Sequence, residues 1–255
     1  MVWQPTATTA IDFNRAWRFR VTAVRVGMFE MIALLAAWMY LPMGLQWSIN
    51  QIDPTSAFDL EKTPLAGAGI QIAGTLLLLL YVTKVRGHHI AYLGFEKPHW
   101  PSDAIFVAVV TAVAGAVYAS IIAILAGLIV WQPDLFGAKS IDPVVDVLRR
   151  NFGVAHINWQ TVLYMALFAP VMEEIWFRGW MYPVVRKHFN AAFSIIAVAL
   201  IFGFAHGTLP IPVSQIIGGL VFTFAYEKRP TIFVPLVLHM LGNGSLLLSS
   251  WLLSL

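Results

Sequence analysis

Cysteine is absent from the 255-residue chain, and charged residues make up only 11% of it. Without cysteine there can be no thiolate nucleophile, no disulfide framework and no cysteine-ligated metal site. An average soluble domain has roughly 25% charged residues. So low a charge content excludes a nucleic-acid-binding module, a disordered chain and an ordinary cytosolic enzyme. The sequence also lacks GxSxG, a paired-aspartate protease motif and a glycine-rich phosphate loop, which leaves serine and aspartyl protease mechanisms and nucleotide binding unsupported.

Apolar residues, in contrast, make up 59% of the chain, against roughly 45–50% in an average domain. A soluble domain of this size could not bury so much apolar surface, so the chain is expected to lie in lipid. Seven apolar runs meet or approach the ~20 residues that a spanning helix needs. They are residues 23–45, 66–83, 104–131, 159–177, 191–209, 211–226 and 231–255. The last run contains two glycines and can form one helix or two. The sequence therefore predicts an all-α membrane bundle of seven, or eight, transmembrane helices.

The chain divides into two parts after residue 158. Residues 1–158 hold the first three spans and carry no catalytic motif. Within them, residues 141–152 have the apolar spacing of a short interfacial helix. Residues 159–255 hold the remaining spans and all the motifs described below.

Lysine and arginine are distributed unequally between the two sides of this bundle. With seven spans, residues 1–25, 84–103, 178–190 and 227–230 share one side and hold 12 of the 16 basic residues. By the positive-inside rule that side, with the N-terminus, is cytoplasmic. No apolar segment with a cleavage site precedes the first span, so no cleaved signal peptide is expected. We expect a multi-pass protein of a bacterial inner membrane, surrounded by lipid, with no nucleic-acid partner.

The fourth apolar run ends in a cluster of ionisable residues, Glu173, Glu174 and Arg178. Ionisable groups inside a bilayer are costly and by default indicate function. Residues four apart share a helix face, so Glu174 is predicted to pair with Arg178, which lowers the cost of burying both. Glu173 lies about 100° away around the helix. It is left without that partner and is a candidate general base.

The fifth apolar run places Phe202 four residues before His206, so that the ring can brace the imidazole. We expect the turn before this run at residues 188–190. Glu173 and His206 lie nearly the same number of residues from that turn, on either side of it. Since both helices rise equally per residue, the carboxylate and the imidazole should face each other at one depth.

The seventh apolar run carries His239 and Asn243, again four residues apart. Such a pair alone would indicate a hydrogen bond between helices. Polar pairs in three separate spans favour a shared site instead. Its candidate residues are Glu173, His206, His239 and Asn243, with Glu174, Arg178 and Phe202 in supporting positions.

Three patterns in these runs, EExxxR at 173–178, FxxxH at 202–206 and HxxxN at 239–243, resemble the motifs of a known family in order and spacing. This is the CAAX-protease and bacteriocin-processing (CPBP) family of intramembrane proteases. The resemblance covers about residues 159–245. It implies an endopeptidase that hydrolyses membrane-associated proteins or peptides, lipidated CAAX-type proteins among them.

The resemblance also implies roles for the site residues. Glu173 would be the general base that activates water, with His206 as its partner, and His239 and Asn243 would form an oxyanion hole. Peptide hydrolysis requires both devices. The remaining residues of the first motif, Glu174 and Arg178, would be structural or would position the substrate.

Members of this family have also been described as metalloproteases. Glu173, His206 and His239 form a Glu–His–His set of the kind that binds catalytic zinc. If zinc used all three, the base would have to be Glu174, which is better explained as the partner of Arg178. We therefore favour a glutamate mechanism without a cofactor, with zinc at these three residues as the alternative.

Two other function classes remain open. One is a catalytically silent membrane scaffold or bacteriocin-immunity protein with the same fold. The other is a transporter with a glutamate–histidine proton relay, which the absence of internal repeats disfavours. In the protease interpretation, the site is expected to open toward the cytoplasm.

Overall fold

The structure is a computed structural model that describes residues 27–53, 64–136, 144, 157–206 and 212–252. The described residues form helices and no strand. The N-terminal elements are α2 (Met28–Ile52), α3 (Pro64–Leu80), the π-helical turn η1 (Tyr81–Val85), the 3-10 turn η2 (Ile90–Leu93), α4 (Ser102–Trp131) and the 3-10 turn η3 (Pro133–Phe136). A composite fourth helix follows, made of α6 (Trp159–Leu163), η4 (Tyr164–Phe168), α7 (Ala169–Glu173), η5 (Glu174–Met181) and α8 (Tyr182–His188). The chain then forms α9 (Ala191–Ala205), α10 (Val213–Lys228) and α11 (Phe233–Leu252).

The predicted all-α membrane bundle is confirmed. Four helical stretches are long and apolar enough to cross a membrane, and α9 is a shorter apolar helix. The four are Met28–Ile52, Leu65–Val85, Ser102–Trp131 and Phe233–Leu252. The last apolar run forms one helix that continues through its two glycines. The predicted interfacial helix at 141–152 lies outside the described residues, except for residue 144.

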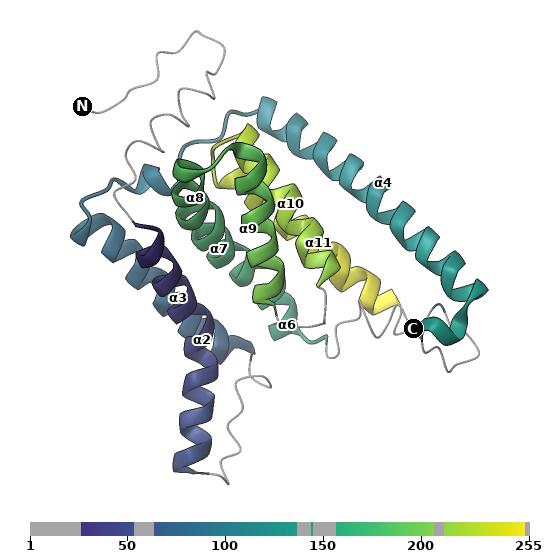
Figure 1. Cartoon of the computed structure of the whole chain (residues 1–255), viewed down its shortest axis with the longest axis horizontal. Coiled ribbons are helices and arrows are strands. Elements are labelled where there is room, and N and C mark those ends of the chain that lie inside the picture. The colour runs from purple at the N-terminus through teal and green to yellow at the C-terminus, as the bar shows by residue number, and fades with distance from the viewer. Residues whose placement is uncertain (1–26, 54–63, 137–143, 145–156, 207–211, 253–255) are drawn as a thin grey trace.

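The fourth helix, α9, α10 and α11 form the centre of the molecule (Figure 1). On one side α2 and α3 pack against the fourth helix, and on the other side α4 leans across α10 and α11 (Figure 1). The turn between α8 and α9 lies where it was predicted, because Asn190 caps α9 by accepting a hydrogen bond from the Phe193 amide at 2.9 Å.

One hydrophobic core joins the two parts that the sequence divides after residue 158. Trp38 of α2 stacks on Trp176 of the fourth helix, with ring centroids 5.0 Å apart. The Trp176 indole N–H donates to the hydroxyl of Thr75 in α3 at 3.0 Å. The same buried cluster reaches Phe202 in α9 and Tyr226 in α10. The N-terminal helices therefore hold the motif-bearing fourth helix in place.

The fourth helix contains two π-helical stretches, η4 and η5, although its sequence predicts a regular α-helix. Each stretch ends just before a proline, Pro170 or Pro183, at the start of the next α-helical segment. In a regular α-helix a proline lacks one hydrogen bond and its ring clashes with the carbonyl four residues earlier. A wider turn before each proline relieves this clash, and the helix continues to His188.

Glycines bring α9 and α10 into close contact. A Cβ atom at Gly219 of α10 would lie 3.0 Å from both the Cα and the carbonyl oxygen of Ala199 in α9. Small residues at helix crossings allow such an approach within membranes.

Replacing Gly219 by alanine is expected to lower the free energy of unfolding by roughly 1–3 kcal/mol, because α10 must move away from α9. The matched control is Gly115→Ala in α4, where an added Cβ would meet nothing within 4 Å. We expect that control to unfold like the wild type when thermal unfolding is followed in detergent. Equal losses in both variants would contradict the close contact.

Candidate active site

The predicted site residues of three helices converge on one carboxylate oxygen. Oε2 of Glu173, at the end of α7, lies 3.8 Å from Nε2 of His206 and 3.7 Å from Nε2 of His239. His206 caps the C-terminus of α9, and His239 lies in the second turn of α11. The predicted equal depth of Glu173 and His206 is therefore present. The side chain of His239 is almost fully buried, while those of Glu173 and His206 are partly accessible.

The other nitrogen of each imidazole is engaged. Nδ1 of His206 lies 2.8 Å from the carbonyl oxygen of Phe202, and Nδ1 of His239 lies 2.7 Å from Oε1 of Glu174. A carbonyl oxygen and an ionised carboxylate accept hydrogen bonds only, so Nδ1 donates in both rings. In a neutral imidazole, Nε2 then carries the lone pair.

Three hydrogen-bond acceptors therefore face one another at the centre of the site. Oε2 of Glu173 is buried and has no hydrogen-bond partner among the described residues. Both Nε2 atoms near it also carry lone pairs when their rings are neutral. Buried polar atoms without partners are uncommon and often mark an ordered water or a ligand. The arrangement suits a proton donor such as water between Glu173 and the imidazoles.

The predicted pair of Glu174 and Arg178 is present and completely buried. Nη1 of Arg178 donates to Oε1 of Glu174 at 2.9 Å, and neither side chain is exposed. Nη2 of Arg178 donates to the carbonyl oxygen of Gly219 at 3.3 Å. Because Oε1 also accepts from His239, Glu174 connects the arginine to the imidazole. The sequence did not predict this second contact of Glu174.

Aromatic rings enclose the charged groups. Phe202 lies edge-on to His206, with centroids 4.8 Å apart, as predicted, and also lies 4.5 Å from the Arg178 guanidinium carbon. Phe222 of α10 stacks on His239, with centroids 4.6 Å apart. Phe222 was not among the predicted residues, and nothing distinguishes it from the other 16 phenylalanines of the sequence.

Asn243 lies one turn after His239 and contacts η4, the first of the two π-helical stretches in the fourth helix. Its Nδ2 donates to the carbonyl oxygen of Met165, within η4, at 2.7 Å. A carboxamide has two N–H donors, so one N–H of Asn243 can still donate to another group. This hydrogen bond links α11 to η4 of the fourth helix.

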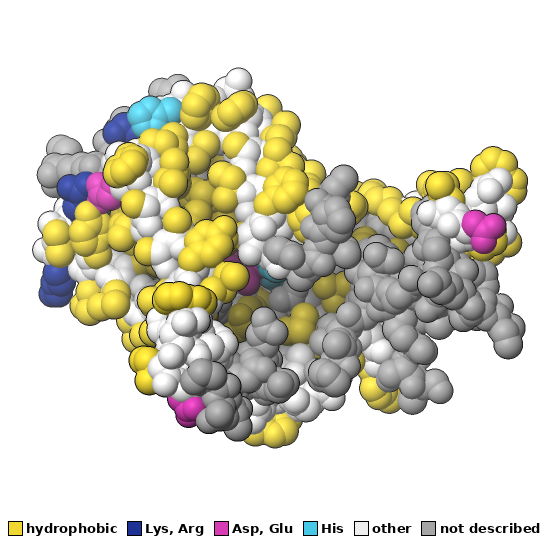
Figure 2. All heavy atoms as spheres, turned by 60° about the horizontal axis from the view of Figure 1, so that its bottom comes forward, with side chains coloured by type: hydrophobic (Ala, Val, Ile, Leu, Met, Phe, Trp, Pro, Cys, Tyr) yellow, Lys and Arg dark blue, Asp and Glu magenta, His cyan; other side chains and the backbone are white. Residues whose placement is uncertain are grey.

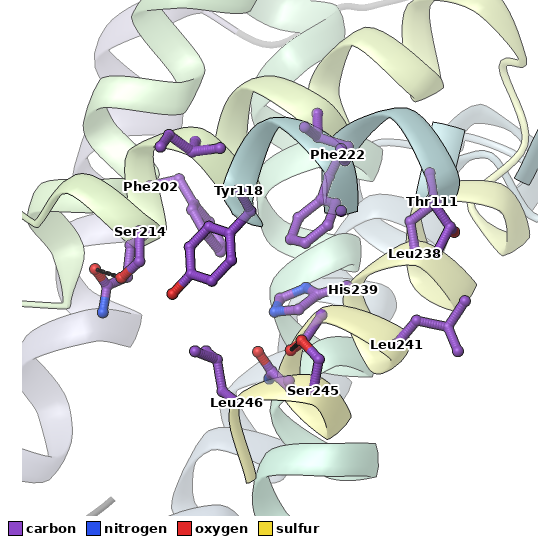
Figure 3. Close-up of a pocket in the computed structure, with 18 of the residues that line it drawn as sticks. Thr111, Tyr118, Phe202, Ser214, Phe222, Leu238, His239, Leu241, Ser245 and Leu246 are labelled. Carbon is purple, nitrogen blue, oxygen red and sulfur yellow. Dashed lines mark hydrogen bonds between the residues drawn. The ribbon is translucent and has the colours of Figure 1, made fainter. Parts of the chain in front are cut away.

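A cavity of about 260 Å³ lies beside the two imidazoles. It is lined by His206, His239 and Asn243 together with residues of α4, α10 and α11, whereas Glu173 is not among its lining residues. In Figure 3, His239 and Tyr118 project into this space from α11 and α4. Figure 2 shows a hollow in the surface, with histidine and acidic side chains at its bottom.

The cavity lies toward one end of the bundle. Its lining includes His206 at the end of α9 and Ser214 at the start of α10, so it lies toward the end opposite the α8–α9 turn (Figure 1). The α8–α9 turn and the turn after α10 belong to the side predicted to be cytoplasmic. That the site opens toward the cytoplasm stays a prediction.

The donor atoms of the site are of the type that zinc binds, namely imidazole nitrogens and a carboxylate. However, no group of three or more His, Asp or Glu side chains in the described part of the chain is arranged to hold a metal ion.

Comparisons with known proteins match the region that carries the motifs. The family described as type II CAAX prenyl endopeptidase Rce1-like matches residues 154–245. A protein of Bacillus subtilis (strain 168) named "Putative membrane peptidase YdiL" is 27% identical over 82 residues, which are 32% of this chain. The match spans 34% of that relative, about a third of its length. No solved structure matches the chain. The resemblance predicted from the three motifs is thereby confirmed.

Proposed function

Because residues 154–245 match the type II CAAX prenyl endopeptidase Rce1-like family, we propose that this integral membrane protein is an intramembrane endopeptidase. The observation that carries the proposal is the convergence of Glu173, His206 and His239 beside a cavity between apolar helices. Its substrates would be membrane-associated proteins or peptides, lipidated CAAX-type proteins among them. A bacterial inner membrane would be its location.

Glu173 would activate the attacking water. A water molecule that donates one hydrogen to Oε2 of Glu173 and the other to Nε2 of His206 would satisfy both acceptors. Its oxygen then attacks the carbonyl carbon of the scissile peptide bond, and its proton passes to Glu173. The electron pair of the carbonyl double bond moves to the carbonyl oxygen, which becomes the oxyanion.

Asn243 and His239 would stabilise that oxyanion. The N–H of Asn243 that is not bound to Met165 can donate to it. His239 donates from Nε2 when both of its nitrogens carry a proton. The electron pair of the oxyanion then re-forms the carbonyl double bond, the carbon–nitrogen bond breaks, and the leaving nitrogen takes the proton from Glu173. The products are one amine and one carboxylic acid, which releases its remaining proton to solvent.

Removal of metal is expected to leave this reaction intact. Glutamate and histidine supply the base and the donors, so no step requires a Lewis acid. We expect the purified, active protein to contain far less than one zinc per chain and to keep its activity in excess chelator. Activity that disappears with a chelator and returns with stoichiometric zinc would establish the metalloprotease alternative.

The orientation of the chain determines where products are released. With a cytoplasmic N-terminus, the cavity would lie toward the end of the bundle away from the α8–α9 turn and the cytoplasm. Because the chain has no cysteine, single-cysteine variants report on one position each. We expect Gln132→Cys, at an exposed position after α4, to react with a membrane-impermeant maleimide in spheroplasts, and His188→Cys, at the exposed α8–α9 turn, to react only after permeabilisation. The reverse pattern would place the N-terminus outside.

Terminal proteomics tests the function itself. Membranes from cells with the wild type, the Glu173→Gln variant or no protein would be compared for new N- and C-termini of membrane proteins. The matched control is Asp134→Asn, the same change at an exposed carboxylate of η3. We expect paired termini in the wild type and the control only. Identical termini in all strains would favour the catalytically silent scaffold.

A further inference from the structure

The cavity beside the imidazoles is partly built by a helix outside the matched region. Thr111, Ala114, Gly115 and Tyr118 of α4 all line it. Their spacing of three and four residues places them on one face of that helix. Residues 154–245 supply the candidate catalytic groups, while α4 supplies the opposite wall. The three-motif pattern therefore does not determine the shape of this wall.

The cavity is largely apolar and also contacts the candidate catalytic groups. Its lining includes His206, His239 and Asn243, together with a few hydroxyl and amide side chains. Much of the remaining lining is apolar, with Phe222 of α10 and Leu246 of α11 among the side chains around the space (Figure 3). A substrate group that contacts the catalytic residues therefore has an apolar space next to it.

The volume of the cavity limits its occupant. Sites for drug-sized ligands usually measure roughly 300–1,000 Å³, and this cavity measures about 260 Å³. It is larger than a few ordered waters need, at ~30 Å³ of liquid volume each. A single bulky side chain fits this size and this apolar lining.

Resting on the proposed function, we propose that this cavity binds one large apolar side chain of the substrate next to the scissile bond, and that Gly115 of α4 sets its depth. The cavity is continuous with His239 and Asn243, the groups that would hold the scissile carbonyl. A side chain on a residue adjoining that carbonyl is within reach of the cavity. Burial of such a side chain would strengthen substrate binding through the hydrophobic effect.

Gly115 offers a direct way to fill the cavity. Gly115 lines the cavity, and a Cβ atom added there would meet nothing within 4 Å, so a side chain can begin at this position without displacing a neighbour. Gly127 in the same helix also has nothing within 4 Å of an added Cβ, and it does not line the cavity. It is the matched control for every change at Gly115.

The first experiment compares cleavage preferences. Proteome-derived peptides are incubated with full-length wild type, Gly115→Leu and Gly127→Leu in liposomes, and the residues flanking each cut are read by mass spectrometry. We expect Gly115→Leu to shift one flanking position from Leu, Met and Phe toward Ala and Ser by at least about tenfold, the scale on which apolar pockets discriminate. Tyr118→Ala, which enlarges the cavity, should shift the preference toward larger residues. Unchanged preferences in both cavity variants would refute the assignment.

The second experiment does not require catalysis. Gly115→Cys and Gly127→Cys, each in the Glu173→Gln background, are modified with N-ethylmaleimide in the presence of Ac-Ala-Ala-Leu-Ala-NH2 or Ac-Ala-Ala-Ala-Ala-NH2. We expect the leucine peptide to slow modification of Cys at 115 several-fold relative to the alanine peptide, with no difference at 127. Protection without any cleavage by the wild type would retain the binding pocket and reject the peptidase. Equal rates at 115 with both peptides would reject the pocket.

Discussion

Replacing Glu173 by glutamine is expected to lower kcat/KM for a cleaved peptide by about 10²–10⁴-fold, the usual contribution of a general base. The amide has nearly the shape of the carboxylate but cannot take a proton from water. Since Oε2 of Glu173 has no hydrogen-bond partner among the described side chains, we expect stability to change by less than ~0.5 kcal/mol. Cleavage of one fluorogenic peptide and thermal unfolding in detergent measure the two effects.

The Asp134→Asn variant serves again as the control, with wild-type activity expected. A tenfold loss of kcat/KM corresponds to only ~1.4 kcal/mol of activation free energy. If Glu173→Gln keeps more than about a tenth of wild-type kcat/KM, Glu173 is not the base. His206→Ala would then show whether an imidazole takes the water proton instead.

The substitution Glu174→Gln, one residue later, is expected to lower the free energy of unfolding. Glu174 accepts from Arg178 at 2.9 Å and from His239 at 2.7 Å, and its side chain is not exposed. Glutamine at 174 removes the negative charge and leaves the buried guanidinium without its counter-ion. Breaking a buried ion pair in this way typically costs about 3–5 kcal/mol.

Glu173→Gln is the natural reference for this prediction, because it makes the same chemical change at the neighbouring position. Thermal unfolding of both variants in detergent gives the comparison directly. We expect Glu174→Gln to melt well below Glu173→Gln. Equal melting temperatures, or the opposite order, would show that Arg178 does not depend on Glu174.

The helices of the bundle follow from the sequence because hydrocarbon leaves few choices. Backbone polar groups in lipid must be satisfied within the segment, so each long apolar run becomes a helix, as with the runs that form α4 and α11. The contact of Glu173 with His206 follows from equal rise along two neighbouring helices. The pair of Glu174 and Arg178 follows from helix periodicity alone.

Other parts of the site depend on tertiary contacts that no local pattern encodes. Pro170 and Pro183 are visible in the sequence, but whether a helix breaks, kinks or widens there depends on what packs around it. The stacking of Phe222 on His239 depends on how closely α10 approaches α11. The sequence predicts this helix to residue 209, whereas α9 ends at Ala205, because no local pattern marks the residue at which it ends.

The attachment of α4 has a consequence for how the membrane acts on the protein. Asp103 in its first turn lies 3.6 Å from Arg229, whose guanidinium also lies over the Phe106 ring. With 30 residues, α4 is about 45 Å long, whereas the hydrocarbon layer is only ~30 Å thick. Helices longer than the layer tilt, and their tilt varies with bilayer thickness. Since α4 forms one wall of the cavity, lipid chain length is expected to alter the width available to a substrate side chain, so that one sequence has different selectivities in thin and thick bilayers.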